Sequence, residues 1–361
     1  MLELRSEAST PRLAGQFIRD DVANLAQQAV DRQAETDPGL REYLAGDGYH
    51  KCVKDTSYPL QALAQALLID EPTLFASYAI WAEVVLSNLG FPHARLVGSL
   101  TAIRNTLVAT LPEAHSSVAA EYVDAALDIL SDALTEPPSA SPEGAPLASV
   151  ATRYLDALLA GDRGAAADIV RGVVAAGAIL PDIYEDVFRA SQREVGLMWQ
   201  SNRLSVAMEH YATGATSAIM AQQFAIERHG TGGTRRFLGA CVEGEQHDLA
   251  IRMVCDVLQS QGWETFFLGA DTPRFTLVQA VEEFRPAVVG LSATWLFNVD
   301  HVSCAVRDIR DARPEVMVVV GGAPFDRIAG LAGKVGADAH GGSLLELPAQ
   351  LDRLIRLSDQ L

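Results

Sequence analysis

The sequence predicts a multidomain α and α/β protein, in which two helical regions precede a C-terminal domain built on a parallel, doubly wound sheet. Three observations support this prediction. From residue 235 onward, strand-like apolar runs alternate with helical segments. Before that point the chain shows helical periodicity without strand alternation. A stretch rich in Pro, Ser and Ala at residues 136–147 lacks periodicity and indicates a linker between the two helical regions.

The first region, residues 1–135, is predicted to be entirely helical. An amphipathic segment runs from about Arg12 to Gln33. Asp70 is expected to cap a helix that has acidic and proline residues in its first turn and stops at Gly90. Two further helices are expected before the linker.

The second region, residues 148–230, contains three or four long helical segments, with breaks at 161–164, 177–181 and Asn202, and predicts a small helical bundle. The third region, residues 235–361, predicts five strands at 237–242, 264–268, 287–292, 316–320 and 337–340. Doubly wound sheets bind ligands at the carboxyl ends of their strands. The loops at 243–248, 292–297 and 321–325 are therefore the expected binding elements.

Composition narrows the range of functions. The chain has 361 residues and a formal net charge of −18, which disfavours contact with nucleic-acid phosphates. Its four cysteines show no CxxC spacing, which is typical of a reduced compartment. The N-terminus lacks a signal-peptide pattern, and no apolar run has the length of a membrane span. We therefore expect a cytoplasmic protein without nucleic-acid or membrane partners.

His247 is the candidate metal ligand, because it lies just past the first strand and opens the following helix. An imidazole there can offer one ring nitrogen to a metal, while the other needs an acceptor. Glu245 is the nearest acceptor in sequence, and Asp248 is the second. The same loop lacks the glycine patterns of dinucleotide and phosphate sites.

This region resembles the cobalamin-binding domain family, whose loop reads Asp-x-His-x-x-Gly and is followed by Ser-x-Leu and Gly-Gly elements. The resemblance covers about residues 235–361 and implies a flavodoxin-like domain in which His247 is the lower axial ligand of cobalt. It also implies a slot for the nucleotide tail, lined by Ser292 and Thr294 with Gly321 and Gly322 at its base. Three positions depart from the pattern: Glu245 for Asp, Ala250 for Gly and Thr294 for Leu. Because Glu245 is one methylene longer than Asp, its bond to His247 is expected to be lost or water-bridged.

The helical region before this domain carries a second signature. Nine residues separate Trp199 from the pair Glu209-His210, which resembles the Trp-x9-Glu-His pattern of light-sensing adenosylcobalamin domains. The resemblance covers roughly residues 148–230 and implies a four-helix bundle that closes over the upper face of the corrin, with Val206 as a small apolar contact. The residue after the tryptophan is Gln200, where those regulators have a histidine. A bis-histidine state after illumination would therefore need His210 or another histidine.

The domain order resembles that of photocobilins, in which a bilin-binding, globin-like helical domain precedes the cobalamin unit. The resemblance implies that the first region binds biliverdin. Its aromatic and basic side chains supply candidate contacts, namely His50, Tyr78, Trp81, His93 and Arg95. The alternative is that this region is a plain dimerisation module.

The resemblances together predict a photoreceptor that binds adenosylcobalamin and biliverdin. Light would break the cobalt–carbon bond and change the packing of the domains, and with it the assembly of a homo-oligomer. No catalytic constellation is needed for this function. The first alternative is a corrinoid methyl carrier of a methyltransferase system, and the second is a mutase subunit, which would require a partner chain.

Overall fold

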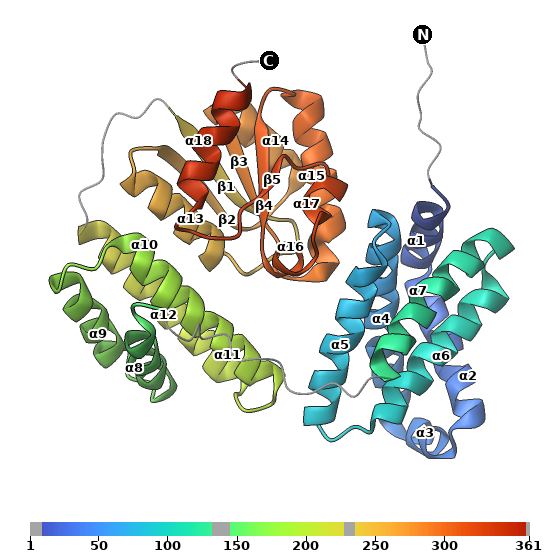
Figure 1. Ribbon diagram of the computed structural model, residues 1–361. Coiled ribbons are helices and arrows are strands. Elements are labelled where there is room, and N and C mark those ends of the chain that lie inside the picture. The colour runs from blue at the N-terminus through green and yellow to red at the C-terminus, as the bar shows by residue number, and fades with distance from the viewer. Residues whose placement is uncertain (1–8, 132–144, 227–234, 359–361) are drawn as a thin grey trace, which may run out of the picture. The chain divides into compact units, whose positions relative to one another are not determined.

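The structure is a computed structural model that describes residues 9–131, 145–226 and 235–358 (Figure 1). The chain divides into two compact units, residues 1–135 and 136–361. Most of the predicted linker, residues 136–144, lies outside the described residues. None of the helices in the described ranges combines the length and the apolar character that crossing a membrane requires.

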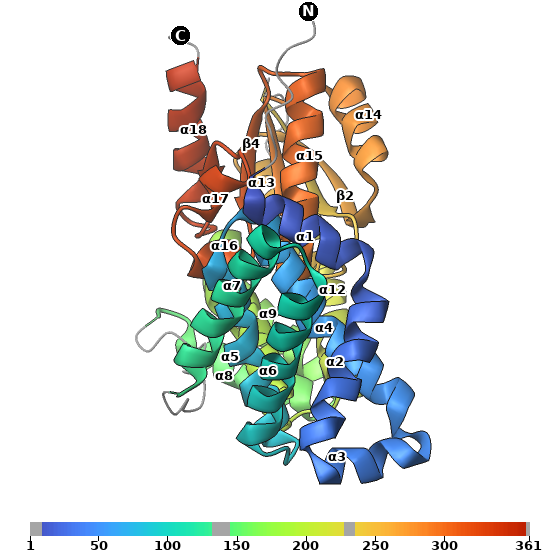
Figure 2. The same cartoon turned by 90° about the vertical axis from the view of Figure 1, so that its right-hand side faces the viewer.

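The first unit is all-helical over its described residues, as predicted. Its elements are α1 (Thr10–Asp20), α2 (Val22–Thr36), α3 (Pro38–Tyr43), the π-helical turn η1 (Leu44–Gly48), α4 (Tyr49–Ile69), α5 (Pro72–Asn88), α6 (His93–Thr110) and α7 (Glu113–Ser131). The amphipathic segment beginning near Arg12 is two helices, because the backbone leaves helical geometry at Asp21. Helix α4 packs against α1, α2 and α5, and α6 and α7 lie side by side (Figure 2).

The start of α5 corrects one expectation. Its N-cap is Glu71, whose carboxylate accepts a hydrogen bond from the Thr73 backbone N–H at 3.2 Å. Asp70 instead adopts a left-handed conformation with φ of 56° and ends α4. Its carboxylate accepts a hydrogen bond from the Tyr122 hydroxyl at 2.8 Å. Asp70 tolerates this backbone conformation better than most residues, so the acidic pair serves two helix ends rather than one.

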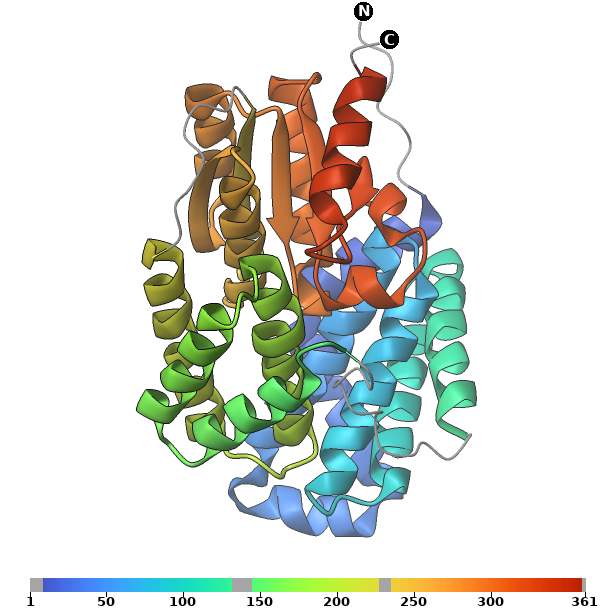
Figure 3. The same ribbon diagram turned by 60° about the vertical axis from the view of Figure 1, so that its left-hand side comes forward.

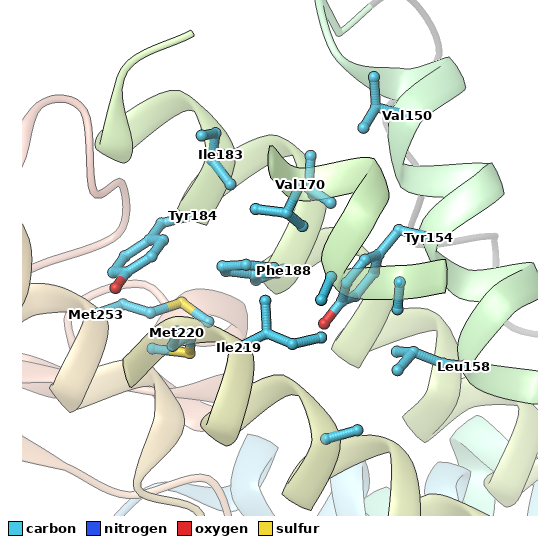
Figure 4. Close-up of a cluster of buried hydrophobic side chains, with 14 of the residues drawn as sticks. Val150, Tyr154, Leu158, Val170, Ile183, Tyr184, Phe188, Ile219, Met220 and Met253 are labelled. Atoms are coloured by element: carbon cyan, nitrogen blue, oxygen red, sulfur yellow. The ribbon is translucent and has the colours of Figure 1, made fainter. Parts of the chain in front are cut away.

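The second unit begins with a helical bundle. It comprises α8 (Ala148–Leu159), α9 (Arg163–Ala175), a continuous stretch of α10 (Leu180–Asp182), η2 (Ile183–Arg189) and α11 (Ala190–Gln200), and finally α12 (Val206–Ile226). Buried aromatic and aliphatic side chains form its core, among them Tyr154, Tyr184 and Phe188 (Figure 4). The same cluster includes Met253 and Val257 from the sheet domain, so the bundle packs directly on that domain.

The C-terminal part of the second unit is a five-stranded parallel sheet with strand order β2-β1-β3-β4-β5 (Figure 3). The strands are β1 (Arg236–Val242), β2 (Glu264–Thr272), β3 (Val288–Ser292), β4 (Met317–Gly321) and β5 (Ala339–His340). The connecting helices are α13 (Leu249–Ser260), α14 (Arg274–Phe284), η3 (Leu296–Asn298), α15 (Val299–Ala312), α16 (Ala323–Arg327), α17 (Leu331–Lys334) and α18 (Leu347–Ser358). This is the predicted flavodoxin-like fold. Strand β2 extends four residues beyond its predicted end, and β5 is only two residues long.

The helices cover both faces of the sheet. Helices α13 and α18 share one face, where Ile251, Cys255 and Leu258 of α13 pack against Phe237 and the leucines of α18. Helices α14 and α15 lie side by side on the other face (Figure 2). Strand order reverses between β1 and β3, so the loops that follow these two strands are neighbours, and this is where a doubly wound sheet binds its ligand.

Candidate functional site

The imidazole of His247 is held by a buried carboxylate. Glu245 lies in the loop between β1 and α13 and is completely buried, whereas 46% of the His247 side chain is exposed. The His247 Nδ1 atom lies 2.5 Å from Glu245 Oε1, which also accepts a hydrogen bond from the His247 backbone N–H at 2.9 Å. The expectation that the longer Glu245 loses this bond is wrong. With Nδ1 engaged, Nε2 is the ring nitrogen that remains to meet a metal.

The second carboxylate oxygen of Glu245 joins this loop to the one after β3. Oε2 accepts hydrogen bonds from the backbone N–H groups of Thr294 at 2.6 Å and Trp295 at 3.0 Å. It also accepts one from Asn298 Nδ2 at 3.1 Å. The extra methylene that distinguishes Glu from Asp therefore gives the carboxylate a longer reach across the strand ends. Asp248, the other candidate acceptor, has no side-chain hydrogen bond to His247 among the described contacts.

These contacts shift the pKa of both groups. Burial acts to raise the pKa of Glu245, but hydrogen bonds from His247 and from the Trp295 backbone outweigh it and hold the pKa at about 2. The hydrogen bond to Glu245 raises the pKa of His247 against the opposing effect of burial. The Glu209 carboxylate in the helical bundle contributes in the same direction.

Asp271, at the end of β2, fixes the loop from its other side. Its carboxylate accepts a hydrogen bond from the Gly244 backbone N–H at 2.7 Å, and its own N–H donates to the Glu245 carbonyl at 2.8 Å. Gly244 has a φ of 83°, and a Cβ there would lie 3.1 Å from Asn298 Oδ1, so a side chain would be strained in both respects.

Asp271, Trp295 and Asn298 were not among the predicted site residues. The usable signal was their position at the carboxyl edge of the sheet, since Asp271 is the penultimate residue of β2 and Trp295 and Asn298 follow β3. Their bonds run to the backbone or the carboxylate of the His247 loop, so no residue type in a single sequence identifies the partners.

Small residues form a row across the same edge of the sheet. Cys241, Ser292 and Gly321 are direct partners in the pairing of β1, β3 and β4. Ser292 is buried, and a Cβ at Gly322 would lie 2.0 Å from the Ala293 carbonyl oxygen. The backbone at Gly322 therefore lies close to the backbone of Ala293, and a side chain at Gly322 would prevent this contact. Thr294 contributes its backbone N–H to Glu245, and its side chain is half-buried.

This arrangement fits a corrinoid. Among the described residues there is no group of three or more His, Cys, Asp or Glu side chains that could hold a metal ion. A corrin ring supplies the equatorial ligands of its cobalt itself, so a single oriented imidazole is the donor set it requires. At Gly322 the missing side chain lets the backbone after β4 come close to the backbone of Ala293 after β3, so both loops lie beside the His247 loop.

The bundle presents the second set of predicted residues. Trp199 is half-buried at the end of α11, and Val206 is 53% exposed at the start of α12. Glu209 Oε2 and His210 Nδ1 lie 2.5 Å apart, and 75% of the His210 side chain is exposed. The structure thus places Val206, Glu209 and His210 in the first turn of one helix.

The five candidate bilin contacts lie on three helices of the first unit, α4, α5 and α6. Tyr78 and Trp81 on α5 have ring centroids 5.9 Å apart, and Tyr78 is buried. His93 Nδ1 lies 3.1 Å from Glu83 Oε2. His50 is exposed on α4, and Arg95 is half-buried on α6. A cavity of about 520 Å³ in this unit lies elsewhere, between α6 and α7, and its lining includes Arg104 and Asp124.

Comparisons with known families define the class of protein. Residues 235–345 match the family model described as a B12 binding domain, and residues 150–222 match a second family model with the same description. Residues 5–130 match the family model of phycobilisome proteins. The sheet domain and the helical bundle that precedes it therefore form a B12-binding unit, and the chain is a cobalamin- or corrinoid-binding protein.

Individual proteins are similar to parts of this chain. The dimethylamine corrinoid protein of Methanosarcina barkeri is 28% identical over 195 residues, which are 52% of this chain and 91% of that protein. The HTH-type transcriptional repressor CarA of Myxococcus xanthus is 32% identical over 130 residues, or 36% of this chain and 43% of that protein. A solved structure of the M. barkeri monomethylamine corrinoid protein has 18% identity and a TM-score of 0.47, covering 55% of this chain and 95% of that one.

Proposed function

We propose that this chain is a light sensor that holds adenosylcobalamin between His247 and the helical bundle and carries a bilin, biliverdin, in its first unit. The observation that carries the proposal is the joining of a B12-binding unit to a match with phycobilisome proteins in one chain. The match falls on the region whose place in the domain order resembles the bilin-binding domain of photocobilins, so this combination favours two chromophores over one.

The lower half of the proposed site is supported by the Glu245 contacts. Glu245 fixes the tautomer and the orientation of His247, which leaves Nε2 for the cobalt. Ser292, Gly321 and Gly322 would receive the displaced nucleotide tail, because they form the small-residue row at the strand ends.

The upper half would be completed by the bundle. Trp199 offers a flat apolar surface for an adenine ring, and Glu209 and His210 offer polar atoms for ribose hydroxyls. Adenosylcobalamin would supply a light-sensitive cobalt–carbon bond. Without the adenosyl group, Trp199, Glu209 and His210 would lose their contact, and the packing of the bundle against the sheet domain would be free to change.

A corrinoid methyl carrier is the second candidate, and the names of the corrinoid relatives favour it. In that function the same His247 would hold the cobalt, but Glu209 and His210 would have no adenosyl group to contact. The match with the dimethylamine corrinoid protein takes up 91% of that relative yet only 52% of this chain. Nearly half of this chain therefore has no counterpart in it, which is why the light sensor is the first proposal.

The test is an absorption spectrum of the full chain reconstituted with adenosylcobalamin in the dark, recorded before and after green light. Loss of the adenosyl spectrum within seconds supports the sensor. A spectrum that is stable in light, together with methyl transfer in the dark, supports the carrier. Addition of biliverdin should give a bound, red-absorbing species, and its absence would contradict the two-chromophore proposal.

His247→Ala tests the lower ligand in the same assay. We expect it to weaken corrinoid binding by at least about tenfold and to change the spectrum, since even removal of an outer-sphere partner costs that much in metal sites. His301→Ala is the matched control, because His301 lies at the same edge, with its Nδ1 2.6 Å from the Glu243 carbonyl. Unchanged affinity and spectrum in His247→Ala would overturn the assignment.

A further inference from the structure

A chain of polar side chains crosses the interior of the helical bundle and ends at Glu209. The Tyr154 hydroxyl on α8 lies 2.9 Å from Thr216 Oγ1 on α12. Gln192 on α11 donates through Nε2 to the same Thr216 oxygen at 2.9 Å. Thr213 Oγ1 lies 3.1 Å from Gln192 Oε1 and also 3.1 Å from Glu209 Oε1, two acceptors that share its single hydroxyl hydrogen. The chain thus ties three helices to one carboxylate.

The location of these groups is unusual for an apolar core. Tyr154 and Thr216 are completely buried, and Tyr154 belongs to the hydrophobic cluster of the bundle, as Figure 4 shows. Buried hydroxyl and amide groups are unfavourable unless each finds a partner, and Phe or Val would fill the same space without that requirement. A network of buried hydrogen bonds makes the core more rigid. At its outer end, this network fixes the position of the Glu209 carboxylate.

The network engages only one oxygen of Glu209. Oε1 receives the Thr213 hydroxyl, while Oε2 lies against His210. Glu209 is 24% exposed, and the adjoining His210 ring is largely exposed. The carboxylate is thus fixed from the inside of the bundle, and its second oxygen and the imidazole remain at the surface.

We propose that Thr213 and Gln192 are positioning residues that aim Glu209 at an upper ligand bearing hydroxyl groups, such as the ribose of an adenosyl group. The inference rests on the proposed function and deepens it. Thr213 acts directly on the carboxylate. Gln192 Oε1 is the second acceptor beside the Thr213 hydroxyl and fixes where that hydroxyl lies, and Thr216 orients Gln192. Selectivity for a hydroxyl-bearing upper ligand then depends on residues that never touch the ligand.

A purely structural role and a positioning role predict different outcomes. A methyl group on the upper face has no hydroxyl for Glu209 to meet. Loss of the Thr213 hydroxyl should therefore weaken adenosylcobalamin binding and leave methylcobalamin binding unchanged. A general loosening of the bundle would weaken both.

The experiment measures the Kd of the full chain for adenosylcobalamin and for methylcobalamin in the dark. For Thr213→Val we expect the ratio of the two affinities to fall about tenfold, the effect of one hydrogen bond to a charged group. Thr213→Ser keeps the hydroxyl and should restore the ratio. Gln192→Leu should give a smaller fall, because it removes the competing acceptor and leaves the Thr213 hydrogen to Glu209. Thr152→Val is the matched control, since Thr152 is an exposed bundle residue that bonds only the Ala148 carbonyl of its own helix.

The possible outcomes distinguish the positioning role of Thr213 from the proposed function. If the unmodified chain prefers adenosylcobalamin and Thr213→Val keeps that preference, the positioning role is wrong and the proposed function stands. If Thr213→Val weakens both ligands equally, the role is structural and the inference is again wrong. If the unmodified chain shows no preference for adenosylcobalamin, the adenosyl part of the proposed function fails first.

Discussion

The two faces of the proposed corrinoid site are built in opposite ways. Below, Glu245 is completely buried and receives hydrogen bonds from two loops of the sheet domain. Above, two of the four bundle residues that would meet a ligand are exposed, Val206 by 53% and the His210 side chain by 75%, while Trp199 and Glu209 are half-buried. The lower face is thus held by hydrogen bonds within the protein, whereas part of the upper face consists of side chains exposed to solvent.

This difference indicates which parts of the site belong to the fold and which belong to the ligand. A buried carboxylate with several donors stabilises the protein whether or not a corrinoid is bound. Exposed apolar and polar side chains gain their contacts only when a ligand covers them. Changes on the lower side should therefore lower the stability of the ligand-free protein, and changes on the upper side should appear only in the complex.

The largest effect is expected for Glu245→Ala. The substitution leaves the N–H groups of Thr294 and Trp295 and the Asn298 amide without their acceptor in a buried place. We expect the ligand-free protein to lose about 3 kcal/mol of stability in the unit that contains the site. Denaturant unfolding of the ligand-free chain, followed by near-UV circular dichroism, measures this loss.

Glu243→Gln provides the matched control for that experiment. Glu243 is an exposed carboxylate in the same loop, and its change should stay within about 0.5 kcal/mol. If Glu245→Ala unfolds at the same denaturant concentration as the unmodified chain, the lower face is not preorganised and the contrast between the faces is lost.

An intermediate effect is expected where the two faces are joined. The Tyr184 hydroxyl in η2 of the bundle donates a buried hydrogen bond to Asp256 Oδ2 on α13 at 2.8 Å. Tyr184→Phe removes this donor to a carboxylate, and we expect a loss of about 1.5 kcal/mol in the ligand-free protein. Thermal unfolding measures the loss, and hydrogen exchange in α13 and η2 shows whether it lies at their contact.

Tyr211→Phe is the comparison for that variant. The Tyr211 hydroxyl bonds the Gly161 carbonyl within the bundle and is exposed, so its removal should have little effect on unfolding. Equal losses in the two tyrosine variants would show that the hydrogen bond between bundle and sheet domain contributes no more stability than the exposed one within the bundle.

Sequence patterns predicted the fold of the second unit well, because its signals are local. The parallel, doubly wound sheet follows from alternating strands and helices, and α13 buries Ile251, Cys255 and Leu258, which lie at helical spacing, on one face. The loop with His247 could be found because it follows the first strand. The first unit was predicted only as helical, and the break at Asp21 and the cap at Glu71 depend on short-range geometry that periodicity does not report.

The network around the site could not be predicted, for a physical reason. Glu245 was expected to lose its direct bond to His247, because its side chain is one methylene longer than that of Asp. The structure shows that the carboxylate spans two loops, one of them about fifty residues later in the chain. Asp271 and Asn298 enter through backbone and carboxylate contacts of the same kind. Such partners are set by which strand ends are neighbours, and that becomes visible only when the sheet is assembled.

The smallest effect on the ligand-free protein is expected at Val206, which also makes it the sharpest test of the contrast. Val206→Ala removes methyl groups that water already reaches, so unfolding without ligand should change by less than about 0.5 kcal/mol. In the complex the same methyl groups would be covered by the upper ligand, and their loss should speed the release of adenosylcobalamin in the dark by about fivefold. Stopped-flow release into an excess of a competing corrinoid binder measures that rate. If Val206→Ala destabilises the ligand-free chain, the upper face is part of the folded core. If it leaves the release rate unchanged, the ligand does not cover this side of the bundle.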